Sequence, residues 1–500
     1  MATKCDNIVV GSGASGLTST LLLAQQGRSV LLLEKASFVG GSLTRFRREN
    51  IPLDTGLHFA GGLGEGGLLD QMLRVLGVRD GIVPAWCSNG AGHHVIFEST
   101  GLSIPVTPGA DSRARVKALF PNDASAIDRY FAMMRSVCER TTTMDLRRVS
   151  EPPESLDEDF VTLDETLRNL TSNEALRCFL STYCMCHGVK PTEISFANHC
   201  RIVHDLHTSL ARVEKGGDAL VAAIMDRLDD LDVDVRLGTS ISHCADVEGD
   251  RVGRFVLDSG ESVECEECVL TMHPKVIIDL LPKDQISKAF IERVSSFERS
   301  VGFFAVYGVI DEGVDVSDIE PAIVSLFPTI DMNEMLDPEC GDERALLVLT
   351  HRETVSGYPR LVVTAIELSF AEDVEAWKDS TTQDRPPEYM EYKRHRTERI
   401  TSRILSLYPE FKDSFRLLEA ATMLTFRDYL NSPEGTAYGV KQKIGQLNLV
   451  GQTRLRNVFV AGQSAVLPGI VGAMMSAFVV TRSIMGKDQF NRYIEERLAE

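Results

Sequence analysis

Three glycines and one acid near the N-terminus form the pattern with the clearest chemistry. Residues 7–16 read Asn-Ile-Val-Val-Gly-Ser-Gly-Ala-Ser-Gly, so Gly11, Gly13 and Gly16 directly follow an apolar run, and Glu34 comes eighteen positions after the last glycine. In such a turn the first glycine permits a tight bend, the second lets the backbone approach a pyrophosphate, and the third lets a helix pack on the strand. The acid accepts hydrogen bonds from a ribose diol, which favours an unphosphorylated ribose. The pattern predicts a dinucleotide-binding site.

The elements that must position this turn are predicted on both sides of it. Residues 8–10 are β-branched and apolar, as a buried parallel strand requires, and residues 17–26 carry leucines at helical spacing. A second apolar run over residues 29–33 ends at Glu34. The glycines therefore lie between a strand and a helix, whose N-terminus attracts the charge of a phosphate. This indicates a Rossmann-like α/β domain.

Length and charge narrow the class of protein. The chain has 500 residues, enough for two or three structural domains, and a formal net charge of -20, which disfavours binding to nucleic acid or to an anionic membrane surface. The first strand begins within about six residues of the start, which leaves no room for a signal peptide. We expect a cytosolic protein. Peripheral contact with a membrane through an apolar patch is the alternative.

Cysteine and histidine do not form a known metal motif. The chain has 11 cysteines without framework spacing, which suits reduced thiols, and Cys265-x-x-Cys268 lacks a second pair at zinc-ribbon spacing. The stretch Cys184-Met-Cys186-His187 and the histidines at 199, 204 and 207 invite a metal interpretation, but no carboxylate completes a ligand pattern. We predict no metal site.

The chain divides into three predicted domains. Residues 1–111, 211–300 and 415–500 together are expected to form a discontinuous nucleotide-binding domain. Residues 112–210 are largely helical in pattern and are expected to form an inserted helical domain. Residues 301–414 contain long strands suited to an antiparallel sheet with one covered face, which is a candidate substrate domain.

Individual strands and helices are predicted within these domains. Helices are expected over residues 68–76, from Gly217 through 228, and over 472–485. Strands are expected over residues 233–241, 255–257, 268–272, 303–310, 345–350, 361–370 and 457–462.

Five motifs along the chain resemble those of one family. They are the N-terminal fingerprint, Gly40-Gly41, Asp54-x-Gly56-x-His58, Gly216-Gly217 and a C-terminal block in which Gly462-Gln463 precedes Gly469-x-x-Gly472. Together they resemble the phytoene desaturase, carotenoid isomerase and retinol saturase group of FAD-dependent oxidoreductases. The resemblance spans nearly the whole chain at its motifs, whereas the helical insert and the central sheet match only in outline. It implies an amine-oxidase-like α/β fold, FAD as the cofactor and a lipophilic small-molecule substrate.

The resemblance also implies roles for individual residues. The diphosphate would be held by Gly11, Gly13, Ser15 and Gly16, and the ribose by Glu34 beside Lys35; Gly40, Gly41 and Ser42 would run along the dinucleotide, with Ile241 on the adenine side. Many relatives have an acid after the glycine of the C-terminal block, whereas here Gln463 follows Gly462, as in the retinol saturase branch. The backbone of Gly469, Ile470, Val471 and Gly472 would start a helix aimed at the isoalloxazine, where its N-terminal partial charge stabilises reduced flavin. Residues 432–439 would line the substrate side of the flavin.

The chemistry expected of such a protein needs no side-chain nucleophile. A flavin carries the redox chemistry, so the protein has to bind it, shape a tunnel and place a carbon–carbon unit against it. The chain has no Gly-x-Ser-x-Gly elbow, no Walker loop and no second strong dinucleotide fingerprint. Saturation of a double bond requires an acid that supplies a proton, and desaturation requires a group that accepts one. Tyr438 and His58 are the candidate catalytic residues.

Several functions remain open at this point. The leading hypothesis is an FAD oxidoreductase that acts on the double bonds of a polyene or isoprenoid, with saturation ahead of desaturation because of Gln463. Redox-neutral cis–trans isomerisation and reductive cyclisation use the same flavin, and the electron donor or acceptor is open. Amine oxidation shares the fold and predicts an aromatic cage. A prenyl-protein escort of the GDP-dissociation-inhibitor type shares the fold without flavin, but the intact glycine turn with Glu34 argues against it.

Overall fold

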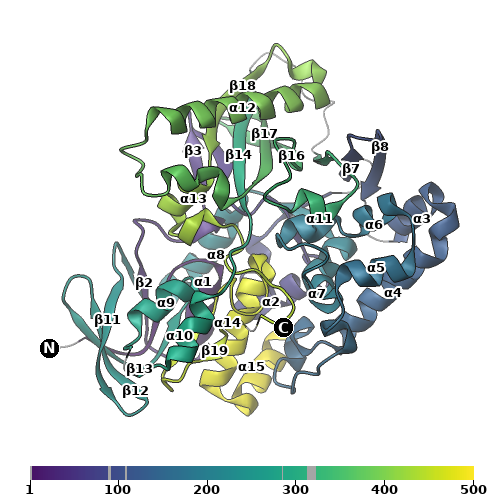
Figure 1. The fold of residues 1–500 in the computed structure, drawn as a ribbon. Coiled ribbons are helices and arrows are strands. Elements are labelled where there is room, and N and C mark those ends of the chain that lie inside the picture. Colours follow the sequence, from purple (N-terminus) through teal and green to yellow (C-terminus); the bar gives the residue numbers. More distant parts are fainter. Residues whose placement is uncertain are drawn as a thin grey trace.

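The N-terminal glycine turn lies at the end of a parallel sheet. A computed structural model of the chain describes residues 3–87, 92–106, 108, 110–283, 285–311, 322–446 and 448–499 (Figure 1). The central strand β1 pairs in parallel with β2 and β13, and β10 and β20 extend the sheet on either side. These strands are β1 (Thr3–Val10), β2 (Val30–Glu34), β10 (Asp234–Leu237), β13 (Ser262–Leu270) and β20 (Val458–Val460). The predicted Rossmann-like α/β architecture is present.

Helices cover this sheet because their apolar residues face its buried strands. Helix α1 follows the glycine turn, and ten of its eleven residues are buried. It packs against α14, which comes from the C-terminal region of the chain, and against α8, so segments far apart in the sequence lie side by side here (Figure 1). The helices of this layer are α1 (Ala14–Ala24), α2 (Leu68–Leu76), α8 (Gly217–Asp230), α14 (Gly469–Met485) and α15 (Lys487–Ala499).

A second sheet has seven strands in the spatial order β18-β14-β17-β16-β15-β7-β8. Its pairs are antiparallel except that β15 and β7 are parallel. The strands are β7 (His93–Phe97), β8 (Leu102–Val106), β14 (Gly302–Ile310), β15 (Ile323–Phe327), β16 (Leu346–Val355), β17 (Tyr358–Ser369) and β18 (Phe415–Ala421). The sheet therefore differs from the predicted 301–414 domain, because β7 and β8 come from the 1–111 range and β18 from the 415–500 range.

The two faces of the second sheet are covered by different elements. Helix α12 (Pro387–Leu407) packs on one face through Ile400 and Ile404, which are fully buried among strand residues. The helical insert packs on the other face (Figure 1). Its helices are α3 (Ala110–Leu119), α4 (Ala124–Arg140), α5 (Leu163–Leu170), α6 (Glu174–Leu180) and α7 (Phe196–Thr208), with the short 3-10 helix η7 (Thr182–Cys186) before α7.

One predicted strand is two strands in the structure. The expected strand over residues 233–241 is divided into β10 and β11 (Ile241–Glu248), because Gly238 lies between them with a φ of 62° that turns the chain. β11 forms a hairpin with β12 (Arg251–Leu257), which pairs with the start of β13. The smaller elements are β3 (Arg45–Arg48), β4 (Ile51–Asp54), β5 (Ala60–Gly61), β6 (Pro84–Trp86), β9 (Leu210–Val213), α9 (Pro274–Leu280), α10 (Lys288–Ser295), α11 (Met332–Met335), α13 (Met423–Leu430) and β19 (Gly451–Gln452).

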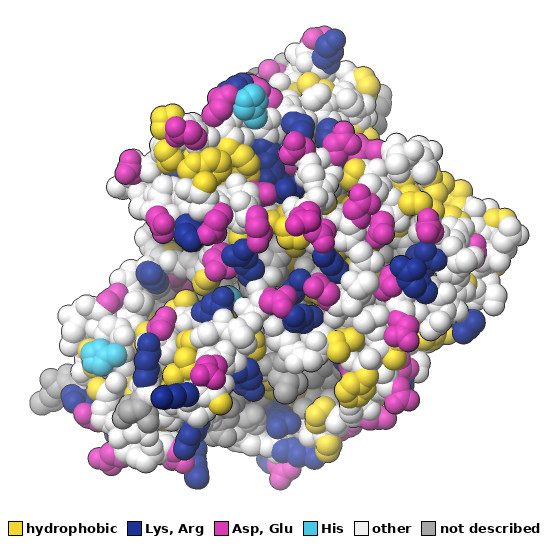
Figure 2. All heavy atoms as spheres, viewed as in Figure 1, with side chains coloured by type: hydrophobic (Ala, Val, Ile, Leu, Met, Phe, Trp, Pro, Cys, Tyr) yellow, Lys and Arg dark blue, Asp and Glu magenta, His cyan; other side chains and the backbone are white. Residues whose placement is uncertain are grey.

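The surface mixes charges of both signs. Figure 2 shows Lys and Arg interspersed with Asp and Glu over the face in view, and hydrophobic side chains gathered near α12 and α13. Among the helices of the described residues, none combines the length and the apolar character needed to span a bilayer.

Candidate functional site

A single large cavity joins the glycine turn to the second sheet. Its volume is about 840 Å³, and its walls come from the nucleotide-binding sheet, the second sheet and the helical insert. Most of the predicted cofactor residues line it: Gly11, Gly13, Ser15, Glu34, Lys35, Gly41, Ser42, Ile241, Gly462, Gln463, Gly469, Ile470, Val471 and Gly472. Both predicted catalytic residues, His58 and Tyr438, line it as well. Gly16 and Gly40 lie behind this wall.

The three glycines of the turn have three different surroundings. Gly11 has a φ of 98°, a backbone conformation that side chains disfavour. A Cβ added at Gly16 would overlap the carbonyl oxygen of Gly11, so this glycine permits close packing of helix on strand. A Cβ added at Gly13 would meet no atom within 4 Å, because this position opens into the cavity. The structure thus separates a ligand-facing glycine from two that shape the turn.

Glu34 is fixed at the end of β2 by the turn itself. Its Oε2 atom accepts hydrogen bonds from the backbone N of Ser12 at 2.8 Å and from Ser12 Oγ at 2.6 Å, and Oε1 accepts one from Ala36 N at 2.8 Å. A carboxylate has about four lone-pair positions, so acceptor capacity remains for a ribose diol. Glu34 is half-buried on the cavity wall, which suits that role.

Ser476 is a residue of the site that sequence reasoning missed. Its Oγ accepts a hydrogen bond from Gly462 N at 2.7 Å, donates to Ala473 O at 2.6 Å and lies 3.1 Å from Ser15 Oγ. Because Ser476 has only one hydrogen to donate, the hydroxyl of Ser15 is the donor between the two serines. Ser15 therefore has its backbone N–H, rather than its hydroxyl, available for a phosphate. A serine within an apolar helix carries no local sequence signal for this role.

The C-terminal block brings a helix N-terminus to the cavity. Helix α14 starts at Gly469, where an added Cβ would meet no atom within 4 Å, while a Cβ at Gly472 would overlap the carbonyl oxygen of Leu467. The first turn of a helix of 17 residues presents unpaired N–H groups and a partial positive charge. This end of the cavity favours a ligand with negative charge.

The other glycine motifs support the turn from behind. Gly40 N donates to Ser12 O at 3.0 Å, and a Cβ at Gly40 would press against Thr44 and Val221. A Cβ at Gly217 would overlap the carbonyl oxygen of Leu43. These glycines are needed because α8 packs directly on the segment that leads away from the turn.

His58 faces the cavity beside a buried ionic network. In this network Arg212 Nη2 lies 2.7 Å from Asp54 Oδ2, and Arg45 Nη1 lies 2.8 Å from Glu353 Oε1. Burial lowers the pKa of His58 to about 4, although the charge of Asp54 acts in the opposite direction. His58 is therefore a neutral imidazole near pH 7, with no extra proton to give.

Tyr438 lies in the segment that was predicted to line the substrate side. Its hydroxyl donates to the carbonyl oxygen of Met185 at 3.2 Å, and its ring meets that of Phe303 edge to face, with centroids 5.9 Å apart. Burial raises the pKa of Tyr438 well above its ordinary value, so it stays protonated. Of the two candidate acids, Tyr438 is the one that retains a proton at neutral pH.

Beyond Tyr438 the cavity is lined mainly by apolar side chains. They come from the face of the second sheet that looks toward the helical insert and from the insert itself. They include Phe303, Ile366, Leu368, Ala345, Leu347, Phe327, Met185, Ile202 and Leu206. A lining of this kind binds a lipophilic molecule and excludes water.

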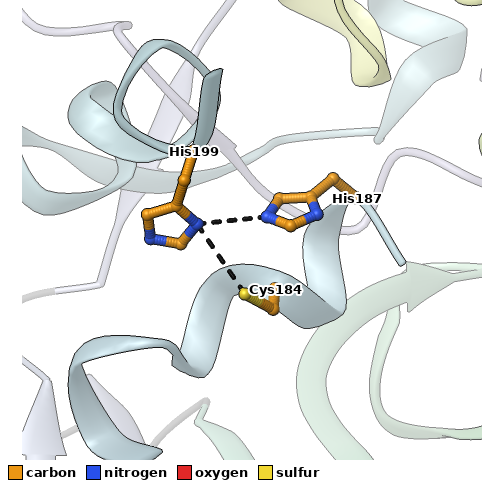
Figure 3. A group of neighbouring side chains, drawn as sticks. All are labelled: Cys184, His187 and His199. Carbon is orange, nitrogen blue, oxygen red and sulfur yellow. Dashed lines mark hydrogen bonds between the residues drawn. The ribbon is translucent and has the colours of Figure 1, made fainter. Parts of the chain in front are cut away.

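Cys184, His187 and His199 converge in the helical insert, although we predicted no metal site (Figure 3). One ligand atom from each lies within 4.8 Å of the others, and all three residues are buried. The hydrogen bonds form a complete neutral chain. His187 Nδ1 accepts from Val189 N at 3.3 Å, so His187 Nε2 carries the proton and donates to His199 Nδ1 at 3.1 Å.

The chain of hydrogen bonds continues from His199 to the backbone. His199 Nε2 then donates to the hydroxyl of Tyr130 at 3.3 Å, which donates to Leu180 O at 2.9 Å. Burial lowers the pKa of His187 to about 3 and raises that of the Cys184 thiol, so both side chains are neutral. A metal ion would have to displace these bonds and deprotonate the thiol, so the cluster is better explained as packing.

The remaining metal candidates of the sequence lie apart. Cys265 and Cys268, three residues apart on β13, pack against the same apolar core, and among the described residues they belong to no cluster of three ligand groups. His204 Nδ1 lies 3.0 Å from Asp205 Oδ1, whereas His207 packs against the rings of Phe131 and Tyr183.

Relatives in sequence match the chain over nearly its whole length. Residues 9–76 match the family model described as an NAD(P)-binding Rossmann-like domain. The chain is 23% identical to the all-trans-retinol 13,14-reductase of Danio rerio, over 97% of this chain and 86% of that protein. It is 22% identical to a protein of the same organism named inactive all-trans-retinol 13,14-reductase, over 96% and 86%. A chloroplastic prolycopene isomerase of Daucus carota is 25% identical over 29% of this chain and 24% of its own.

Solved structures share the fold. An oxidoreductase from Methanosarcina mazei superposes with a TM-score of 0.65 at 13% identity, covering 96% of this chain and all of that one (100%). Putrescine oxidase bound to putrescine superposes with a TM-score of 0.61 at 13% identity, covering 99% of both chains. These likenesses confirm the predicted family resemblance and the predicted Rossmann-like, amine-oxidase-like fold.

Proposed function

We propose that this chain, a homologue of the retinol 13,14-reductases and prolycopene isomerases, is an FAD-dependent oxidoreductase acting on carbon–carbon double bonds of a lipophilic polyene or isoprenoid. Saturation is the favoured direction, because Gln463 follows the C-terminal glycine as in the retinol saturase branch. The observation that carries the proposal is the continuity of the cavity. One space runs from the nucleotide cradle at Gly13 to the apolar chamber beyond Tyr438.

The residues of the cradle fit FAD. Gly13 and Gly469 leave room where a Cβ would otherwise stand, and the N-termini of α1 and α14 both present backbone N–H groups to the cavity. Glu34 would bind the ribose, Ile241 would contact the adenine, and the backbone from Gly469 would lie against the isoalloxazine. Bound there, the flavin supplies hydride transfer at its N5 atom.

The chain's own residues would bind the substrate and supply the proton. The apolar walls beyond Tyr438 orient a lipophilic chain and keep water away. The phenol of Tyr438 holds its proton at Oη, where Met185 O orients it. His58, a neutral imidazole that also lines the cavity, is the weaker candidate for proton donation.

A polyene isomerase is the second candidate function. The likeness to a prolycopene isomerase favours it, and the same cavity serves both reactions. Stopped-flow spectra of the flavin during turnover distinguish them. A saturase oxidises its reduced flavin once for each bond saturated, whereas an isomerase leaves the flavin in the same redox state after each cycle.

Other functions on this fold have less support. Amine oxidation predicts two aromatic rings that face each other across the substrate, but Tyr438 and Phe303 meet edge to face, with an angle of 87° between their planes. A prenyl-protein escort needs no flavin and so does not account for the open glycine cradle.

The decisive experiment starts from the visible spectrum. We expect the purified protein to show a flavin absorption band, and the photoreduced protein to be reoxidised by polyenes in the absence of oxygen. No band after incubation with FAD would overturn the proposal. A band without reoxidation by any polyene, together with turnover of simple amines, would favour amine oxidation instead.

A further inference from the structure

The apolar chamber has a floor made by one face of the second sheet. Strands β14, β17, β16 and β15 lie side by side, and residues paired across strands share a face. Phe303 pairs with Leu368, and two residues along the same strand Ile366 pairs with Leu347. Leu347 in turn pairs with Ser325. The floor is therefore a continuous track from Phe303, beside Tyr438, to Ser325.

The track changes from apolar to polar at Ser325. Ser325 pairs with Val95 of β7, and His93 lies two residues from Val95 on the same face. His93 Nε2 lies 2.8 Å from Ser325 Oγ, and His93 Nδ1 lies 3.4 Å from Tyr183 Oη. Tyr183 belongs to η7 of the helical insert. All three residues are nearly fully buried, and all three line the cavity. We call Tyr183, His93 and Ser325 the polar triad.

One hydroxyl hydrogen of the polar triad has no acceptor within the triad. Burial lowers the pKa of His93 to about 3, so its ring is neutral, with one N–H donor and one bare nitrogen. In either tautomer one hydroxyl donates to the bare nitrogen and the other accepts from the N–H. The accepting hydroxyl then has a hydrogen without a partner among the described residues, on a side chain that is almost fully buried. A polar group that is buried and unpaired costs free energy, which a ligand oxygen would recover.

The neighbouring residue Thr182 also has a buried hydroxyl without a partner among the described residues. Thr182 precedes Tyr183 in η7, lines the same cavity and is buried, with a relative exposure of 5%. Its Oγ1 atom has no hydrogen-bond partner among the described residues. Thr182 thus adds a second incompletely satisfied hydroxyl to the one that the polar triad leaves in the apolar chamber.

We propose that the polar triad binds the uncharged polar end, a hydroxyl or carbonyl oxygen, of the lipophilic substrate, whose apolar chain lies along the track back to Tyr438. This rests on the proposed function and specifies its substrate. A hydroxyl or carbonyl is favoured over a carboxylate, because no lysine or arginine is among the described groups that act electrostatically on His93 and could serve as a counter-ion.

The length of the track restricts where the reacting bond lies. From β14 to β15 there are three interstrand steps of about 4.8 Å, and the track also moves two residues, about 7 Å, along β17, so its ends lie roughly 16 Å apart. The double bond presented beside Tyr438 would then lie about that far from the polar end of the substrate. In retinol the 13,14 bond is next to the carbon that bears the hydroxyl. Retinol bound to the polar triad by its hydroxyl would not place its 13,14 bond beside Tyr438. The substrate of this chain is therefore a longer molecule than retinol, or it reacts at a bond farther from its polar end.

Ligand binding tests this proposal without relying on turnover. The probes are parinaryl alcohol, the matching tetraene hydrocarbon and parinaric acid, whose fluorescence reports transfer into an apolar site of the full-length, FAD-loaded protein. We expect the alcohol to bind about threefold to tenfold more tightly than the hydrocarbon, as one net hydrogen bond provides. At pH 7 we expect the acid to bind more weakly than the alcohol.

Two variants and one control test whether the polar triad causes the preference for the alcohol over the hydrocarbon. Ser325→Ala and Tyr183→Phe should each abolish the preference for the alcohol and leave the affinity for the hydrocarbon unchanged. Thr364→Val is the matched control, because it removes a buried, unpartnered hydroxyl from the same sheet face without touching the polar triad. It should keep the wild-type preference. Thermal unfolding of each variant establishes that it is folded.

The outcomes separate this proposal from the proposed function. Equal affinity of the wild-type protein for alcohol and hydrocarbon overturns the polar triad as a binding site and needs no variant. A preference for the alcohol that survives in both folded variants also overturns it. In either case, binding of the hydrocarbon and a flavin band would leave the proposed function in place. Failure of every probe to bind, together with no flavin band, overturns both.

Discussion

Ser15 Oγ lies 3.1 Å from Ser476 Oγ, although 461 positions separate the two residues in sequence. Ser15 is in the first turn of α1 and Ser476 is in the second turn of α14, so this contact joins the two helix N-termini that face the cavity. Ser476 also holds the backbone of Gly462 at the end of β20. The hydroxyl of Ser476 thus connects the N-terminal and C-terminal parts of the proposed cofactor site.

Replacement of that hydroxyl should weaken both folding and cofactor binding. Ser476→Ala leaves the N–H of Gly462 buried without a partner, which costs about 1–3 kcal/mol in the free energy of unfolding. Urea denaturation measures this cost, and titration of the apoprotein with FAD should show lower affinity. Ser483→Ala in the same helix is the control, because Ser483 is exposed and its hydroxyl donates to Val479 O within the helix. Equal behaviour of the two variants would contradict the role assigned to Ser476.

Local motifs predicted the glycine turn between strand and helix, whereas contacts between distant segments had to come from the structure. The glycine fingerprint specifies its own turn, because the bend and the helix that follows lie within a few residues. Ser476 and the polar triad carry no such pattern, since each gains its role from a partner on another element. The pairing of β7 with β15 depends on the sheet as a whole. Residues 93–106 were therefore predicted to belong to the nucleotide-binding domain, whereas they form strands of the second sheet.

Two glycines in one turn should fail in different ways when each is changed to alanine. Gly13→Ala should fold normally, because Gly13 has a φ of -70° and its Cβ position is open, but the methyl group should occupy the space of the dinucleotide and abolish the flavin band. Gly16→Ala should destabilise the fold by about 1–3 kcal/mol or more, because the methyl group overlaps Gly11 O. Thermal unfolding and FAD titration of both variants test this. Retention of full FAD affinity in folded Gly13→Ala would contradict the proposed cradle.

Buried neutral histidines should make the protein sensitive to acid. Burial lowers the pKa of His187 to about 3, below the ordinary value of 6.5, so the unfolded chain binds the proton first as the pH falls. The stabilising contribution is complete above pH 6.5 and declines as the pH drops toward 3. Between pH 7 and pH 5 this single residue should reduce the free energy of unfolding by about 2 kcal/mol.

Urea denaturation at the two pH values checks this linkage. His187→Gln removes the titrating group and should reduce the difference between pH 7 and pH 5, even if the variant is less stable at both. His243→Gln, at an exposed position, should retain the wild-type difference. An unchanged difference in His187→Gln would show that His187 does not titrate on unfolding as the structure implies.

Tyr438 should control proton delivery without controlling binding. Tyr438→Phe removes the hydroxyl that donates to Met185 O but keeps the ring against Phe303, so FAD and polyene should bind as before. If the phenol supplies the proton, the reoxidation of photoreduced flavin by a polyene should slow by about 10²–10⁴-fold. In the wild-type protein this rate should not change between pH 6 and pH 8, because burial keeps the pKa of Tyr438 well above that range.

His58→Gln should have a much smaller effect on this rate, because His58 has a pKa of about 4 and is already neutral. A larger loss in His58→Gln than in Tyr438→Phe, with a rate that falls as His58 loses its proton, would assign the acid to His58 instead.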